Sequence, residues 1–152
     1  AARVWSSASG ECLCTLEGHK NWVWSAAFSP DGTQVVTASE DGTAKLWSAA
    51  SGECRCTLEG SRSPVRSAAF SPDGALVVTV SEDGVARLWS SELGECLHLL
   101  DGHGATVRDA VFSPDGASVV TPSIDGTAKL WDVSSGECFR TLEGHVDRVT
   151  SA

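Results

Sequence analysis

The sequence of 152 residues contains no methionine and no tyrosine, and it has 11 Lys and Arg against 20 Asp and Glu. The resulting formal charge of −9 repels phosphates and anionic lipid, which argues against binding to nucleic acid or to an acidic membrane surface. No apolar run approaches the roughly 20 residues that a membrane-spanning helix needs. No basic segment followed by an apolar core opens the chain as a signal peptide would. We therefore expect a soluble chain without membrane insertion.

Sustained helical periodicity is also missing. Short runs rich in Val, Thr, Ala, Leu and Trp, each of about six residues, are separated by Pro-Asp-Gly, Asp-Gly or Ser-Gly-Glu, which predicts strands joined by tight turns. In one unit we expect strands at residues 23–28, 34–39, 43–48 and 54–58, and two further units begin at residues 65 and 107. With two strands at the start of the chain and one at its end, the pattern predicts about 15 strands.

The unit recurs every 42 residues, as from Trp47 to Trp89 and Trp131. Its landmarks in the first copy are Gly18-His19, Phe28-Ser29-Pro30-Asp31-Gly32, Ser39-Glu40-Asp41 and Leu46-Trp47. A period of this length, with a Gly-His opening and a Trp at the close, resembles the WD40 repeat. The resemblance implies an all-β fold, a WD40-type β-propeller in which each repeat supplies one four-stranded blade. The Trp-Asp pair that names the family survives at Trp131-Asp132.

The resemblance covers the whole chain and describes residues 1–152 as one partial propeller. Residues 1–17 match the end of a preceding blade, residues 18–59, 60–101 and 102–143 are three full repeats, and residues 144–152 match the start of a further repeat. Because a repeat needs neighbours to bury its faces, we expect a piece of a longer propeller with about seven blades. Self-association, the parent chain or a larger complex would supply the missing blades.

Six cysteines raise the question of disulfides or a metal. Cys12, Cys54, Cys96 and Cys138 occupy one repeat position, so they are not bonding partners, while Cys14 and Cys56 complete two Cys-x-Cys pairs. Two ligands in a blade fall short of the four of a structural zinc site. We expect buried, reduced, structural cysteines, no metal or other cofactor, and a reducing intracellular compartment, with the cytoplasm as the default.

Pro122 stands where the other repeats have Ala38 and Val80, inside an expected second strand. Proline has no amide hydrogen to donate to a ladder, so we expect a bulge or a local loss of pairing there.

In WD40 proteins the His of Gly-His, a Ser of the second strand, the Asp of the next turn and the Trp of the third strand form a hydrogen-bonded chain. The resemblance assigns this structural role to His19, Ser39, Asp41 and Trp47 in one blade and to His103, Ser123, Asp125 and Trp131 in another. Buried indole and imidazole groups need such partners. In the middle repeat Ser61 replaces the histidine. We expect this blade to be the least stable of the three, because Ser81, Asp83 and Trp89 lack the imidazole.

Ser, His and Asp are also the ingredients of a hydrolytic triad. The recurrence of the set, the burial that it implies and the absence of a Gly-x-Ser-x-Gly elbow argue against this alternative. We therefore expect no catalytic residues and no enzymatic activity.

In this family the top face is lined by residues that flank the first Val of the inner strand and by the residue before the turn Asp. The corresponding positions predict a partner-binding surface made of Trp22, Trp24, Glu40, Pro64, Arg66, Glu82, Thr106, Arg108, Ile124, Arg148 and Thr150. These positions differ between repeats while the framework recurs, which is typical of a specific binding surface on a repeated scaffold.

Trp22 and Trp24 are the strongest signal in this set, because Trp and Arg are enriched among interface hot spots. Alternatively, Trp24 fills space between blades and Trp22 covers a loop. Mixed Arg and Glu favour a protein or peptide partner. The expected function is a non-enzymatic protein-binding or peptide-binding scaffold, and the alternative is a purely structural subunit of a large assembly.

Overall fold

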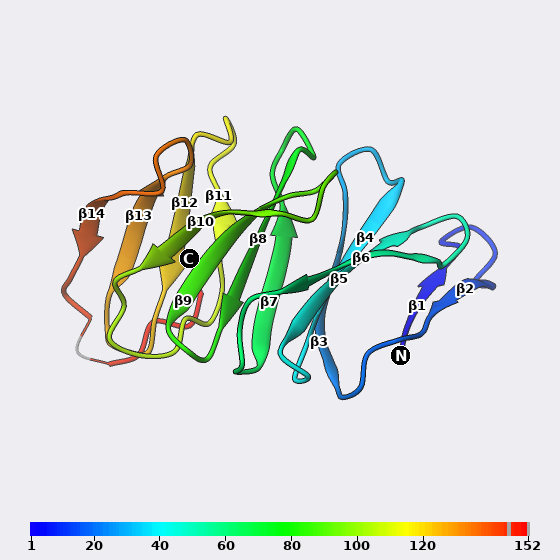
Figure 1. Ribbon diagram of the computed structural model, residues 1–152, viewed down its shortest axis with the longest axis horizontal. Helices are drawn as coiled ribbons and strands as arrows, with labels where there is room; N and C mark the ends of the chain where they lie inside the picture. Colours follow the sequence, from blue (N-terminus) through cyan, green and yellow to red (C-terminus); the bar gives the residue numbers. More distant parts are fainter. Residues whose placement is uncertain (146, 152) are drawn as a thin grey trace.

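The computed structural model describes residues 1–145 and 147–151. Within these residues there are 14 strands and no helix, and the sheets follow one another along the long axis of the molecule (Figure 1). A two-stranded sheet of β1 (Ala2–Trp5) and β2 (Cys12–Leu16) lies at the amino-terminal end. None of the described residues forms a helix with the length and hydrophobicity needed to cross a membrane.

Three four-stranded antiparallel sheets follow, each with its strands paired in chain order. Blade 1 consists of β3 (Val23–Phe28), β4 (Gln34–Ser39), β5 (Thr43–Ser48) and β6 (Cys54–Glu59). Blade 2 consists of β7 (Val65–Phe70), β8 (Leu76–Ser81), β9 (Val85–Ser90) and β10 (Cys96–Asp101). Blade 3 consists of β11 (Val111–Phe112), β12 (Ser118–Pro122), β13 (Ala128–Asp132) and β14 (Cys138–Leu142).

The core lies between sheets rather than inside any one of them. Leu46 and Leu58 of blade 1 belong to the same buried cluster as Val65 and Trp89 of blade 2. An equivalent cluster joins blade 2 to Trp131 of blade 3, and another joins β1 and β2 to Trp47. Trp47, Trp89 and Trp131 are therefore each buried against the preceding sheet, which is why a single repeat cannot bury its own faces.

The Pro-Asp-Gly turns join the first and second strands by side-chain chemistry that the sequence specifies. The Ser29 hydroxyl donates to Asp31 over 2.6 Å, and Asp31 accepts from the Thr33 amide over 3.0 Å. Gly32 completes the turn at φ 71°, a left-handed conformation that glycine adopts without the penalty of a Cβ.

Pro122 shortens the inner strand of blade 3. In blade 2, β7 pairs with β8 from Val65 to Phe70, whereas β11 pairs with β12 only at Val111 and Phe112. The remaining link is an isolated bridge between Val107 and Ser123. The expected local loss of pairing is observed, because the proline offers no amide hydrogen for the ladder.

The fifteenth strand, expected at the carboxy-terminal end, is absent from the described residues. Residues 147–151 form no strand, although the Val149 amide donates to the Ser123 carbonyl over 3.0 Å. Residue 152, which the expected strand includes, lies outside the described residues. A strand needs a partner along its length, and here the described pairing amounts to this one bond.

The expectation of buried cysteines is wrong for four of the six. Within the described residues all six are free, but Cys12, Cys54, Cys96 and Cys138 are exposed. They begin the outermost strand of each sheet, where a bulge shifts the register beside the framework tryptophan. The bulge breaks the alternation of faces that the Cys-x-Cys spacing implies. Cys14 and Cys56 are half-buried.

Candidate functional site

Four side chains of blade 1 form a buried hydrogen-bonded chain. His19 Nδ1 lies 2.9 Å from Asp41 Oδ2, and His19 Nε2 lies 2.7 Å from the Thr37 hydroxyl oxygen. The Trp47 indole N–H donates to the same hydroxyl over 2.8 Å. Because a carboxylate only accepts, Nδ1 carries the proton, and Nε2 accepts from the Thr37 hydroxyl.

Blade 3 repeats the arrangement with His103, Asp125, Thr121 and Trp131. The imidazole Nδ1 lies 2.9 Å from the carboxylate, and Nε2 lies 2.8 Å from the threonine hydroxyl, which accepts from the indole over 2.8 Å. The histidine, carboxylate and tryptophan named from the sequence are thus brought together in both blades.

The linking hydroxyl belongs to a threonine, not to the serine that the resemblance named. Ser39 instead accepts from the Asp41 amide over 3.1 Å, and Ser123 donates to the Thr106 carbonyl over 3.0 Å. Both serines therefore hold the loops around the network. The signal for the threonine was present in the sequence, since Thr37, Thr79 and Thr121 recur at the repeat interval two residues before the serine.

Blade 2 replaces the imidazole with a guanidinium. Arg87 donates to Asp83 Oδ2 over 2.8 Å and to the Ser81 hydroxyl over 3.1 Å. The Trp89 indole N–H still donates to Thr79, over 2.9 Å. Asp83 therefore has a charged partner in blade 2, but no imidazole joins it to Thr79 and Trp89. The lower stability expected of this blade stays a prediction.

The pKa shifts of the histidine and the carboxylates agree with the hydrogen bonds of the networks. Burial lowers the pKa of His19 below its ordinary value. Burial works against ionisation of Asp41, but hydrogen bonds from Thr43, the Lys20 amide and His19 outweigh it and hold that pKa far below its usual range. For Asp83, burial is outweighed by hydrogen bonds, chiefly from Arg87, which lower the pKa to about 2. The carboxylates are ionised and His19 is neutral near pH 7.

Thr37, His19 and Asp41 have the order of a catalytic triad, but the residue in the position of the nucleophile is buried. Thr37 has an exposed fraction of 0%, and its hydroxyl oxygen also accepts from an indole. Triad catalysis requires a nucleophile that reaches the substrate carbonyl. The geometry supports a structural role for the network.

Backbone hydrogen bonds join pairs of the residues that the sequence assigned to the top face. The Glu40 amide donates to the Trp22 carbonyl over 2.9 Å in blade 1. The same bond joins Glu82 to Pro64 over 3.0 Å and Ile124 to Thr106 over 3.1 Å. Each blade thus brings together two of its predicted residues, from the loop before the inner strand and from the turn after the second strand.

Side chains connect this surface from blade 1 to blade 2. The Arg66 guanidinium carbon lies 4.0 Å from the centroid of the Trp24 ring, and Arg66 also forms an ion pair with Glu82. The Thr106 hydroxyl donates to the Glu82 carbonyl over 3.3 Å and extends the connection to blade 3. Stacking and ion pairing together hold Arg66 in one orientation.

The remaining predicted residues make fewer contacts with other parts of this surface. Trp22 is 73% exposed, and Arg148 and Thr150 are also exposed. Arg108 is half-buried, and its amide donates to the Pro122 carbonyl over 3.1 Å. Of the two tryptophans, Trp24 contacts Arg66 of the next blade, as expected if it fills space between blades, whereas Trp22 is exposed.

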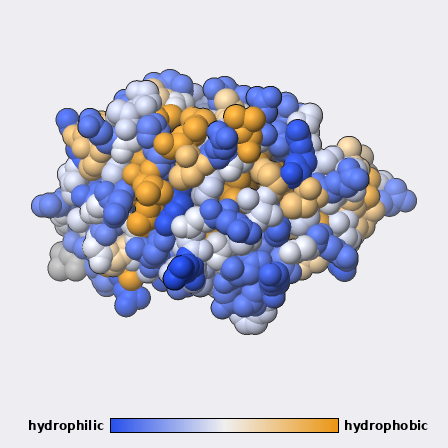
Figure 2. All heavy atoms as spheres, in the orientation of Figure 1, coloured by the Kyte–Doolittle hydropathy of each residue, from blue (hydrophilic) through white to orange (hydrophobic). Residues whose placement is uncertain are grey.

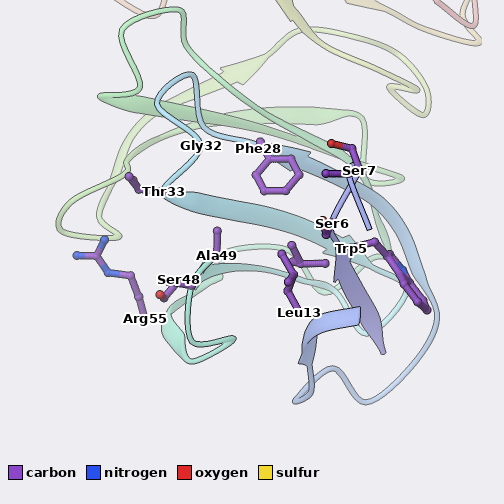
Figure 3. Close-up of a pocket in the computed structure, with 13 residues that line it drawn as sticks. Trp5, Ser6, Ser7, Leu13, Phe28, Gly32, Thr33, Ser48, Ala49 and Arg55 are labelled. Atoms are coloured by element: carbon purple, nitrogen blue, oxygen red, sulfur yellow. The ribbon is translucent and has the colours of Figure 1, made fainter. Parts of the chain in front are cut away.

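A separate cleft of about 770 Å³ lies between the two-stranded sheet and blade 1 (Figure 3). Trp5, Leu13 and Phe28 line it and are 56%, 60% and 55% exposed. The tryptophans equivalent to Trp5 are buried in the other sheets, where two further strands lie inside them.

No group of three or more His, Cys, Asp or Glu side chains that could hold a metal occurs among residues 1–145 and 147–151.

Successive four-stranded sheets share their cores, and two of the three repeat one buried hydrogen-bonded network. This arrangement defines the chain as a β-propeller repeat protein. The family model described as WD domain, G-beta repeat matches residues 10–48, 52–90 and 94–132. The chain belongs to the WD40-repeat family.

Curated relatives match over about the length of one repeat. Nuclear distribution protein PAC1 of Mycosarcoma maydis is 54% identical over 35 residues, which cover 23% of this chain and 8% of that protein. Lissencephaly-1 homolog 1 of Paramecium tetraurelia is 40% identical over 43 residues, which cover 28% of this chain and 11% of that protein. The chain therefore spans about a tenth of the length of these relatives.

Proposed function

We propose that this chain is a non-enzymatic scaffold that binds a protein or peptide through its top face. The observation that carries the proposal is the position of Trp22, which is 73% exposed and joined through its carbonyl to Glu40. It adjoins the surface on which Arg66 is held by Trp24 and Glu82. An exposed aromatic anchor beside a pre-organised charged platform is the composition of an interface hot spot.

The partner's chemistry follows from the mixed charges. Arg66 and Arg148 alternate with Glu40 and Glu82, which suits a peptide or protein surface of both signs better than a ligand of one sign. One relative is named as a nuclear distribution protein and the other as a lissencephaly-1 homolog, but each match is about one repeat long. The similarity supports a role as an interaction scaffold built from repeats. The names of the relatives assign no particular partner to this chain. The free cysteines of the described residues support the further proposal of a reducing, intracellular compartment.

Peptide selection from a random display library tests the proposal. Peptides selected on the wild-type chain should lose most of their affinity, by about tenfold or more, for Trp22→Ala, as is usual for a hot-spot residue. Leu93→Ala is the matched control, because Leu93 is 66% exposed in the turn between β9 and β10, at the other end of blade 2. Peptides that bind both variants equally well would place the binding surface elsewhere.

A structural role in a larger assembly is the second candidate. The exposed apolar side chains of the cleft beside β1 and β2 favour it, since apolar surfaces of this kind usually meet another protein surface. Further blades, from a parent chain, a second copy or a complex, are the partners that would cover it.

A further inference from the structure

Blade 2 carries a groove on its outer rim that is independent of the top face. Its volume is about 370 Å³, and Gly60, Arg87 and Trp89 line it together with Leu97 and Leu99 of β10. We call it the β10 groove. The corresponding surface of blade 1, around Gly18, Lys45 and Thr57, holds a pocket of only about 90 Å³.

One exchanged cross-strand pair explains why the groove is open in blade 2. In blade 1, Lys45 lies opposite Thr57, and its ammonium donates to the Thr57 hydroxyl over 2.7 Å. Blade 3 has the same bond, from Lys129 to Thr141, over 2.9 Å. In blade 2 the pair is Arg87 and Leu99, and leucine offers no acceptor.

Arg87 therefore turns away from the outer strand. Its guanidinium binds Asp83 and Ser81, and the residue is 9% exposed. The long cationic side chain that crosses to the outer strand in blades 1 and 3 does not cross in blade 2, and Leu99 is left 61% exposed.

The backbone edge beside the groove is also free. β10 pairs with β9 on one side and ends its sheet on the other, within the part of the chain that the structure describes. Edge strands are usually protected from further pairing by charged side chains, as Arg55 does for β6 and Arg140 for β14. The run from Cys96 to Leu100 has no such charge. Figure 2 shows apolar surface gathered where Figure 1 places β10.

Charge around the groove selects the partner. Glu59 lines it, and Glu95 and Asp101 lie just before β10 and at its end. Arg87, which also lines the groove, is already paired with Asp83, and the ring Nε2 of His98 lies 3.1 Å from the Ser134 carbonyl oxygen. A basic segment gains from these carboxylates and from the net charge of −9, whereas an acidic segment is repelled.

We propose that β10 binds an extended peptide segment as an additional strand. An aliphatic side chain of that segment enters the β10 groove, and Lys or Arg residues flank it. The backbone edge supplies affinity through main-chain hydrogen bonds, and the groove supplies selectivity, as in strand addition generally. This goes beyond the proposed top-face function and does not depend on it.

The test titrates the wild-type chain with the synthetic peptide acetyl-Lys-Val-Leu-Val-Lys-amide, followed by calorimetry and by amide exchange of residues 96–100. We expect binding that slows exchange of those amides. The peptide with Glu in place of both Lys should bind about tenfold or more weakly, and a peptide N-methylated at alternate residues should not bind. These comparisons leave the protein unchanged, so folding does not affect them.

Protein variants complete the test. Leu97→Lys, which places a charge on the edge, and Leu99→Thr, which restores the residue of blade 1, should each weaken binding by about fivefold or more. Leu13→Lys is the control, because Leu13 holds the equivalent position on β2, and Trp22→Ala should also bind normally. Absence of binding at millimolar peptide, or binding that survives N-methylation or Leu97→Lys, would overturn the proposal.

Discussion

Arg87 donates to Asp83 over 2.8 Å, in the blade that has no histidine in its network. In blade 1 the equivalent carboxylate, Asp41, is paired with His19. The two partners come from different elements, since Arg87 lies on β9 and His19 lies in the loop before β3. A paired carboxylate is thus kept in both blades, although its partner is a neutral imidazole from the loop in blade 1 and a guanidinium from the third strand in blade 2.

This relationship changes the expected outcome of restoring the histidine. Ser61→His should not raise the melting temperature, because Arg87 already binds Asp83 and the new imidazole must compete with it. The double variant Ser61→His, Arg87→Lys recreates the blade 1 combination and should melt above Ser61→His alone. Thermal melts of both decide this, and a single variant that is more stable than the wild type would show that Arg87 is a poor substitute.

The linking threonine should matter more than the serine named from the sequence. Thr37→Val removes the hydroxyl that joins the indole of Trp47 to the imidazole of His19. It should lower the free energy of unfolding by about 1–3 kcal/mol, the usual result of leaving buried polar groups unpaired. Urea denaturation measures this. Thr79→Val is the matched control and should lose less, because that hydroxyl binds an indole but no imidazole; equal losses would contradict the linking role.

The fold could be predicted from the sequence, because strands, turns and framework tryptophans recur at one interval. The contacts made by residues that differ between repeats were harder to predict. The exchange of Lys45 for Arg87 looks conservative, yet a planar guanidinium reaches Asp83, while the lysine binds across the sheet to Thr57. The outcome depends on Leu99, which is 12 residues from Arg87 in the chain and opposite it in the sheet.

For the candidate surface, too, the sequence predicted some of the contacts and not others. Family spacing predicted which residues share the top face, and the backbone bonds from Glu40 to Trp22 and from Glu82 to Pro64 bring them together. It did not predict that Arg66 stacks on Trp24, since contacts between blades depend on the packing of separate sheets. The bulge that exposes Cys54 could not be predicted from the sequence either. The expectation of buried cysteines assumed that side chains alternate between the two faces of a regular strand.

Gly60 should tolerate no side chain. A Cβ built there lies 2.9 Å from the Trp89 ring and 3.1 Å from Arg87 Cδ, so Gly60→Ala forces the core of blade 2 to shift. We expect a loss of about 1–3 kcal/mol in the free energy of unfolding. Gly104→Ala is the control, since nothing lies within 4 Å of its Cβ. Calorimetric melts compare the two, and similar melting temperatures would contradict the close packing.

The free energy of unfolding should fall in two steps as the pH is lowered. His19 is kept neutral by burial, with a pKa below 6.5, so below that pH the unfolded chain binds the proton preferentially and the folded state loses stability. The slope is at most about 1.4 kcal/mol per pH unit for one group. His19→Gln should remove its share of the slope between pH 6.5 and 5.5 in urea denaturation series, and an unchanged slope would refute the assignment.

The second step belongs to the carboxylates. The pKa of Asp83 is lowered from 3.8 to about 2, so its stabilising contribution is present above pH 4 and is lost as the pH falls toward 2. Asp83→Asn should flatten the stability profile in that range. A profile as steep as that of the wild type would assign the acid transition to other groups.

The exposed cleft beside β1 and β2 should make the isolated 152-residue chain associate with itself. Trp5 and Phe28 are 56% and 55% exposed on facing elements of this cleft, and monomeric proteins seldom leave joined apolar surfaces in water. Trp5→Ser with Phe28→Ser should shift sedimentation toward the monomer, whereas Leu93→Ser, a change at an isolated exposed leucine, should leave the distribution unchanged. If the wild-type chain sediments as a monomer at micromolar concentration and binds no hydrophobic dye, the cleft does not drive association.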